Sequence, residues 1–197
     1  QEKGVEADDV IATVVRQFDV KNTKIIISSG DKDLAQLVNK NVVLINSFDS
    51  KILDQEGVKE KFGVNPNQIF DYLCLVGDTS DNIPGVPKVG PKTAVTLLEK
   101  YGDLDNIVSK SSELKGKLRE NIESSLETIQ LAKKLVALKD DLKLPVDLNK
   151  LQRNTIDEKQ LEKIIKKYEL KALSEKLNIK TKKKEIKKDY QLIKSIT

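Results

Sequence analysis

The 197-residue sequence contains no histidine, methionine or tryptophan, and it has a single cysteine, Cys74. Without an imidazole, a Ser/His/Asp triad and a histidine general base are both excluded. One thiol can form neither an internal disulfide nor a cysteine zinc cluster. Any catalysis must therefore depend on carboxylates, lysines, hydroxyls or a metal ion held by oxygen ligands.

Long apolar runs and targeting signals are also missing. No segment approaches the ~20 consecutive apolar residues of a membrane span, and the chain does not open with a signal-peptide pattern. We therefore expect a soluble, cytoplasmic protein with no membrane partner. Because the initiator methionine is absent as well, we interpret the chain as a piece of a longer protein.

Charge is distributed unevenly along the chain. Residues 151–197 carry 14 basic and 7 acidic side chains, whereas residues 1–150 carry 21 basic and 24 acidic ones. A basic tail behind a mildly acidic body favours a polyanionic partner. However, the chain has 32 lysines and only 3 arginines, so a general bias towards lysine explains the tail equally well.

Apolar spacing predicts an α/β fold with a partial parallel sheet, followed by a helical region. A helix is expected over residues 5–18, then strands at 24–29 and 42–45 with a short helix at 34–38 between them. Such alternation is typical of a parallel layer. After these elements only helices are expected, at 54–62, 66–76, 93–101, 113–138 and 157–177.

Carboxylates stand out at three places in this pattern. One group begins the first expected helix, one follows the first expected strand, and one follows Gly77. Ligands of open parallel sheets bind beyond the C-terminal ends of the strands, which is where the second group lies. In chain order the groups are Glu6, Asp8 and Asp9, then Asp31 and Asp33, then Asp78 and Asp81.

Each acidic group taken alone could serve only to cap a helix, because carboxylates bind free amides and suit the helix dipole. Seven clustered carboxylates without matching basic neighbours in sequence would instead repel one another and require divalent cations. Oxygen-only ligands indicate Mg²⁺ or Mn²⁺. Two such ions ~4 Å apart can clamp a phosphodiester during in-line attack. The catalytic candidates are Asp8, Asp9, Asp31, Asp33, Asp78 and Asp81, with Glu6 as a further metal ligand.

Residues 83–102 are rich in glycine, proline and lysine, and their pattern indicates a tight turn followed by a helix. Glycines permit a tight turn, and Pro91 suits the first position of the next helix. The amides at that helix start, with lysines beside them, could bind a phosphate without reading bases. An ordinary corner between two helices is the alternative. The DNA-binding candidates are Gly85, Val86, Lys88, Val89, Gly90, Lys92 and Thr93.

Three segments carry a resemblance to a known family: residues 4–11 (GVEADDVI), 29–38 (SGDKDLAQLV) and 76–86 (VGDTSDNIPGV). In this order and spacing they resemble the 5′-nuclease domain of bacterial DNA polymerase I. The resemblance covers about residues 1–178 and implies a PIN-like core. Residues 179–188 would then be a charged linker, and 189–197 the start of a truncated, proofreading-type domain.

The resemblance also implies roles for the acidic residues. Asp8 and Asp9 would be direct metal ligands, and Glu6 would act through water. The aspartates after the first strand would lie near the metals, and the pair after Gly77 would hold the second ion. Residues of about 69–106 would form a helix-hairpin-helix that grips the DNA backbone and binds K⁺. The family has glycine where this chain has Lys88, which puts the hairpin geometry and the potassium site in question.

The function expected from this resemblance is metal-dependent hydrolysis of DNA near a 5′ end or at a 5′ flap, for primer removal and excision repair. The expected partner is double-stranded DNA, bound by a monomer, and the isolated chain should bind duplex but cleave poorly. Two alternatives stay open. One is a non-catalytic helix-hairpin-helix binding module, and the other is a related nuclease that cleaves RNA.

Overall fold

The computed structural model describes residues 4–20, 23–46, 50–144, 147, 150–153 and 155–178. The chain divides into two compact units, Gln1–Leu148 and Asn149–Thr197. The expected linker at 179–188 and the expected domain start at 189–197 lie outside the described residues. Within the described part, no helix combines the length and the apolar character that crossing a membrane requires.

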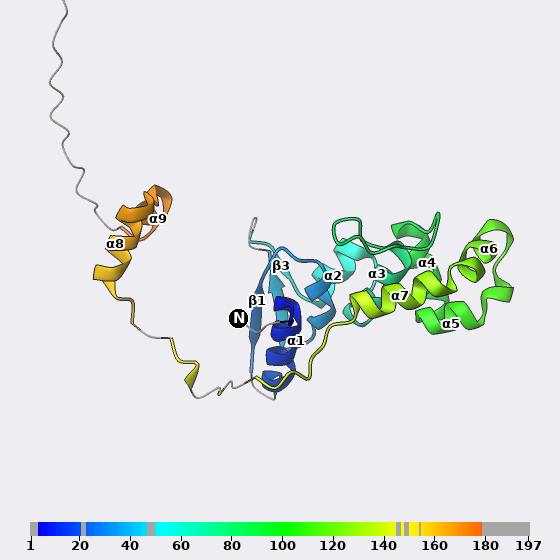
Figure 1. Ribbon diagram of the computed structural model, residues 1–197, viewed down its shortest axis with the longest axis horizontal. Coiled ribbons are helices and arrows are strands. Elements are labelled where there is room, and N and C mark those ends of the chain that lie inside the picture. The colour runs from blue at the N-terminus through cyan, green and yellow to red at the C-terminus, as the bar shows by residue number, and fades with distance from the viewer. Residues whose placement is uncertain are drawn as a thin grey trace, which may run out of the picture. The chain divides into compact units, whose positions relative to one another are not determined.

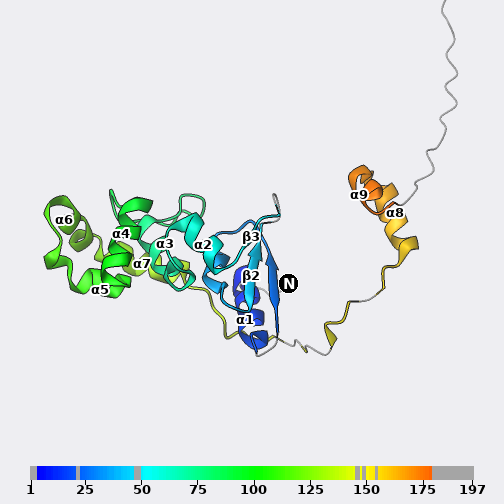
Figure 2. The same ribbon diagram turned by 180° about the vertical axis from the view of Figure 1, so that it is seen from behind.

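The first unit begins with a small α/β layer (Figure 2). Helix α1 (Ala7–Phe18) is followed by β1 (Ile25–Ser28), the 3₁₀ helix η1 (Asp33–Leu37) and β2 (Val42–Ile45). The two strands pair in parallel, which confirms the predicted layer. A short third strand, β3 (Ile52–Leu53), pairs antiparallel to β2. The sheet is therefore mixed rather than purely parallel, and β3 was not predicted.

One face of this sheet carries the core. Ile27 of β1 and Leu44 of β2 are buried on that face and pack with Val15 of α1. On the other face, Ile26 is 63% and Ile52 is 61% exposed. In a parallel layer both faces are normally covered, which explains why apolar residues are present on both. Within the described residues, only one face is covered.

The rest of the first unit is helical and extends from the sheet as α3 to α7 (Figure 1). Its centre is α3, whose Ile69, Leu73, Cys74 and Leu75 are all buried in the same core as the strands. Helices α4, α5 and α7 pack around α3. In chain order the elements are α2 (Gln55–Phe62), η2 (Pro66–Gln68), α3 (Ile69–Val76), α4 (Pro91–Tyr101), α5 (Leu104–Ser109), η3 (Ser111–Glu113), α6 (Gly116–Ser124) and α7 (Leu126–Val136).

Two long helices predicted from the sequence are interrupted in the structure. Residues 113–138 do not form one helix, because Leu114 is extended and Ser125 separates α6 from α7. Residues 157–177 divide into α8 (Glu158–Tyr168) and α9 (Lys171–Lys176) in the second unit. There Glu169 ends α8 in a left-handed conformation with φ of 51°. Amphipathic periodicity survives such short breaks, so it did not reveal them.

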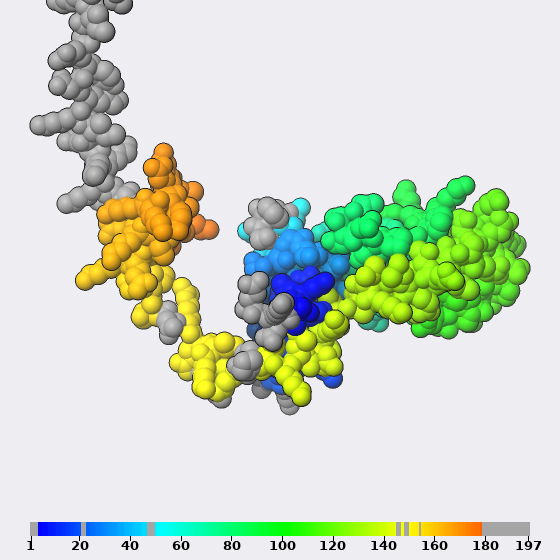
Figure 3. Space-filling view, in the orientation of Figure 1, coloured from blue at the N-terminus to red at the C-terminus, as the bar shows by residue number. Residues whose placement is uncertain are grey.

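The segment after α7 returns to α1 and ties the two ends of the first unit together (Figure 3). The Leu142 amide donates a hydrogen bond to Thr13 Oγ1 at 3.3 Å. Arg16 forms an ion pair with Asp140 at 2.6 Å. These bonds connect residues more than a hundred positions apart and thereby fix α1 against the rest of the unit.

Candidate metal centre

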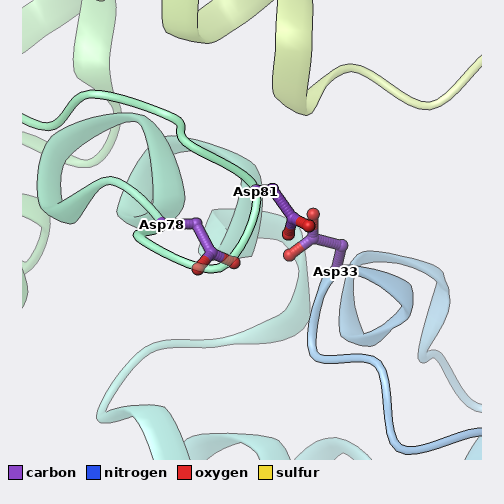
Figure 4. A group of neighbouring side chains, drawn as sticks. All are labelled: Asp33, Asp78 and Asp81. Carbon is purple, nitrogen blue, oxygen red and sulfur yellow. The ribbon is translucent and has the colours of Figure 1, made fainter.

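Three carboxylates from two distant parts of the chain meet at one point (Figure 4). Asp33 begins η1, just after the C-terminal end of β1, while Asp78 and Asp81 lie in the loop after α3. One oxygen of each residue lies within 4.8 Å of the other two. The sheet edge and the helical region therefore contribute jointly to a single acidic cluster, which we call the Asp33/Asp78/Asp81 cluster.

The loop that carries Asp78 and Asp81 is held tightly by its own hydrogen bonds. Asp78 and Ile83 pair through both backbone groups, at 2.9 and 2.7 Å. The Ser80 amide and hydroxyl both donate to Asp78 Oδ1, at 2.9 and 2.5 Å. One oxygen of Asp78 is thus engaged within the loop, which leaves Oδ2 for other partners.

Two glycines allow this loop to lie directly against the end of α3. Gly77 has φ of +76°, and a Cβ on Gly85 would lie only 2.2 Å from the carbonyl oxygen of Val76. Side chains larger than hydrogen cannot occupy that space. The glycines therefore set the position of Asp78 relative to the helix.

The other half of the cluster is fixed by a turn after β1. The Asp31 amide donates to Ser29 Oγ, and the Asp33 amide donates to Asp31 Oδ1, both at 3.0 Å. Asp31 is exposed, whereas Asp33 is half-buried. Asp31 thus orients the backbone that presents Asp33 to the loop after α3.

The Asp33 carboxyl is the most perturbed acid of this cluster. Burial, followed by repulsion from Asp31, Asp78 and Asp81, raises its pKa to about 6. Its Oδ1 is buried and has no hydrogen-bond partner among the described residues. An unpartnered buried carboxylate oxygen is costly unless a cation or a donor satisfies it. The residues present therefore fit a divalent ion with oxygen ligands.

The two loop aspartates differ from each other. Burial would raise the pKa of Asp78, but the ion pair with Lys32 and the hydrogen bonds from Ser80 outweigh burial and lower it to about 2. Burial and the proximity of Asp78 raise the pKa of Asp81. Asp78 is therefore a firmly ionised carboxylate, and Asp81 shares the repulsion of a crowded acidic site.

The acidic group at the start of α1 lies near this cluster, but its members differ in environment. Burial raises the pKa of Asp8, as do the neighbouring charges of Asp31, Glu6, Asp9 and Asp81. Glu6 itself is exposed at the helix start. Asp9 is buried, and its Oδ1 accepts a hydrogen bond from the Lys139 amide at 2.9 Å.

The predicted phosphate-binding residues between α3 and the first turn of α4 differ in their exposure to solvent. Val86 and Val89 are buried, and their amides donate to the carbonyls of Leu75 and Val86. Lys88 is exposed with φ of 61°. Gly85 is half-buried against α3, and Gly90 is the N-cap of α4, whose first turn contains exposed Lys92 and half-buried Thr93.

Two residues of the cluster had no assigned role in the sequence analysis. Ser80 holds Asp78 Oδ1, and Lys32 Nζ lies 2.5 Å from Asp78 Oδ2. The expectation that the acidic groups lack basic neighbours is therefore wrong for Lys32. Its position between Asp31 and Asp33 was the available signal, but sequence alone could not show that it reaches across to the loop after α3.

Family models cover most of the chain. Residues 1–63 match the model of the 5′-3′ exonuclease N-terminal resolvase-like domain, and residues 64–159 match that of the 5′-3′ exonuclease C-terminal SAM fold. The boundary between the two matches falls at the end of α2. The acidic cluster thus combines Asp33 from one family segment with Asp78 and Asp81 from the other.

Curated proteins and solved structures agree with these matches. The chain is 42% identical over 170 residues to a 5′-3′ exonuclease of Aquifex aeolicus, covering 86% of this chain and 58% of that protein. It is 43% identical over 150 residues to a DNA polymerase I of Rhizobium leguminosarum, covering 76% of this chain and 15% of the polymerase. The chain thus spans only part of the length of these relatives.

Among solved structures, the 5′-exonuclease of bacteriophage T5 with bound zinc matches with a TM-score of 0.65 and 26% identity, covering 70% of this chain and 52% of that one. A complex of the bacteriophage T5 flap endonuclease with DNA and metal ions matches with a TM-score of 0.65 and 25% identity, with the same coverage. With both of its family segments matched in order, the chain belongs to the 5′-3′ exonuclease family.

Proposed function

We propose that the chain is the metal-binding and DNA-binding part of a 5′-nuclease that hydrolyses phosphodiester bonds near a 5′ end or at a 5′ flap. The observation that carries this proposal is the Asp33/Asp78/Asp81 cluster, in which Asp33 Oδ1 is buried and has no hydrogen-bond partner in the part of the chain that the structure describes. Relatives named 5′-3′ exonuclease and DNA polymerase I support it. Primer removal and excision repair in the bacterial cytoplasm are the roles that this activity would serve.

The carboxylates would hold the divalent ions. Asp33, Asp78 and Asp81 would form one part of the site, and Glu6, Asp8, Asp9 and Asp31 would complete it. Carboxylate oxygens suit Mg²⁺ or Mn²⁺, and we expect two ions. When bound, such ions activate water and stabilise charge that develops on a phosphate. The chain itself supplies a rigid acidic frame, because Ser80 and the glycine-lined loop fix Asp78 before any ion binds.

The turn before α4 would hold the DNA backbone. The amides of Lys92 and Thr93 belong to the first turn of α4, where helix geometry provides no carbonyl acceptor. Exposed Lys88 and Lys92 add positive charge next to these amides. Phosphate would thus be bound at Gly90, Lys92 and Thr93, with Gly85, Val86 and Val89 shaping the turn. We also propose that this turn binds a potassium ion.

The proposed domain organisation follows the family. Residues 1–178 would be the C-terminal part of the nuclease domain, with a helix-hairpin-helix at about 69–106. Residues 179–188 would link it to a following domain that begins at 189–197. The chain would act as a monomer on double-stranded DNA.

The test uses Asp81→Asn in a protein that contains this chain together with the upstream region of its relatives. We expect loss of Mg²⁺-dependent cleavage of a 5′-flap DNA, with duplex binding retained, because Asp81 lies in the cluster and not in the turn before α4. Unchanged cleavage would favour the non-catalytic binding module. Equal or faster cleavage of an RNA flap would favour the RNA nuclease.

A further inference from the structure

Lys32 brings a positive charge into the acidic cluster. Its side chain leaves the turn after β1, between two acidic residues, and crosses to the loop after α3. There Nζ lies 2.5 Å from Asp78 Oδ2. The Asp78 side chain is 3% exposed and that of Lys32 is 37% exposed. The ion pair is thus sheltered on the carboxylate side and open to solvent on the lysine side.

The ammonium occupies the oxygen that a metal ion would need. Asp78 Oδ1 already accepts two hydrogen bonds from Ser80, so Oδ2 is the oxygen left for a cation. The charge of Lys32 also acts on all three members of the cluster: it helps to lower the pKa of Asp78, and it opposes the burial and the carboxylate repulsion that raise the pKa of Asp33 and Asp81. A single lysine therefore partly neutralises a site in which three carboxylates repel one another.

We propose that Lys32 is a built-in counter-cation that holds Asp78 in the metal-free protein and must leave Oδ2 when a divalent ion binds. This inference rests on the proposed metal-binding function of the cluster. An ammonium offers hydrogen-bond donors but no lone pair, so it cannot join the ligands of a metal ion. Lys32 thereby stabilises the empty site and weakens the affinity for the ion by competing with it.

The first experiment measures Mn²⁺ binding to the 197-residue chain by isothermal titration calorimetry, in the wild type and in Lys32→Met. Removing a competing charge should tighten Mn²⁺ binding about tenfold, by analogy with the effect of one neighbouring charge on a carboxylate. The melting temperature without metal should fall, because Asp78 loses its partner, and saturating Mn²⁺ should close most of the gap. Lys115→Met, an exposed lysine that precedes α6, is the matched control and should change neither quantity.

The outcomes separate this inference from the function on which it rests. If wild type binds Mn²⁺ and Asp81→Asn does not, the metal site stands. Equal or weaker binding by Lys32→Met would then overturn the role of Lys32 alone. If wild type binds no Mn²⁺, both the metal site and the counter-cation role are rejected.

A second measurement needs no substitution, so it applies even if Lys32→Met does not fold. Wild-type protein is treated briefly with an amine-acetylating reagent, with and without Mn²⁺, and acetylation of each lysine is quantified by peptide mass spectrometry. Acetylation of Lys32 should rise severalfold on addition of Mn²⁺, because the displaced ammonium enters solvent, while that of Lys115 should stay constant. Unchanged or reduced acetylation of Lys32 would overturn the proposal.

Discussion

At the scale of single residues, the acidic cluster holds carboxylates that repel one another. Asp33 is half-buried next to three other aspartates, and its pKa is raised to about 6. A carboxyl whose pKa is higher in the folded state than in the unfolded state binds its proton more tightly when folded. Asp33 therefore makes the metal-free protein less stable as the pH rises from about 4 to about 6, and the loss persists at neutral pH.

This predicts that Asp33→Asn stabilises the metal-free protein at pH 7. We expect the free energy of unfolding to rise by about 1–2 kcal/mol. This is less than the pKa shift alone would give, because Asp33 is only half-buried. The gain should be complete above about pH 6, fall as the pH drops towards 4, and vanish below about pH 3, where Asp33 is protonated in both states. Urea unfolding followed by circular dichroism at several pH values measures it.

The control for Asp33→Asn is Asp105→Asn. Asp105 is 84% exposed and pairs with Lys133, so its neutralisation should give no gain at pH 7. A loss of stability in Asp33→Asn at pH 7 would show that the carboxylate, even without metal, has a favourable partner, contrary to the geometry described here.

At the scale of elements, the sequence predicted best where local signals and packing agree. Gly77 and Pro91 correctly marked the end of α3 and the start of α4, because glycine readily adopts the positive φ found at Gly77 and proline suits the first turn of a helix. The two-residue strand β3 and the short helix α5 were missed, since neither is long enough to show a period. The acidic groups were found from their places at element ends. A cluster of these groups was expected, and Asp33, Asp78 and Asp81 do meet. Which oxygens meet could not be predicted, because that depends on how α3 packs beside η1.

Two glycines of the loop between α3 and α4 should differ in how much stability the protein loses when each is replaced by alanine. Gly85→Ala should destabilise the protein by about 3 kcal/mol or more, because its Cβ would overlap the backbone of Val76 and Gly77. Gly90→Ala should change stability by less than about 1 kcal/mol, since nothing lies within 4 Å of the added Cβ and the backbone there is extended. Chemical denaturation of both variants tests the pair, and equal effects would contradict the close approach at Gly85.

In the same loop, two substitutions of Lys88 can separate the effect of its backbone strain from the effect of its charge. Its φ of 61° is unfavourable for a residue with a Cβ, so Lys88→Gly should stabilise the protein by up to about 1 kcal/mol. Lys88→Ala keeps the strain and should not. Both variants remove the ammonium, so both should reduce the salt dependence of duplex-DNA binding by about one phosphate contact. Fluorescence anisotropy across a salt series measures this, and an unchanged slope would exclude Lys88 from the DNA interface.

At the scale of the whole molecule, the first unit is closed by contacts between its beginning and its end. Backbone amides of the segment after α7 donate hydrogen bonds to Asp9 and Thr13 on α1. In the sequence, the sheet and all the other helices of the unit lie between α1 and this segment. α1 also carries Asp8 and Asp9 of the proposed metal site. The closure that stabilises the unit therefore positions acidic side chains beside the cluster formed by the β1 edge and the loop after α3.

Asp9 takes part both in closing the first unit and in the proposed metal site, and substitutions can separate the two roles. Asp9→Ala leaves the Lys139 amide without its acceptor and should cost about 1–3 kcal/mol of unfolding free energy. Asp9→Asn retains a carbonyl oxygen that can accept the same hydrogen bond, so its stability should stay within about 1 kcal/mol of wild type. If Asp9 also binds metal, Asp9→Asn should still bind Mn²⁺ more weakly, as calorimetry would show. Normal Mn²⁺ binding by this stable variant would mean that Asp9 serves only to hold the returning segment, and that the ions depend on the remaining carboxylates.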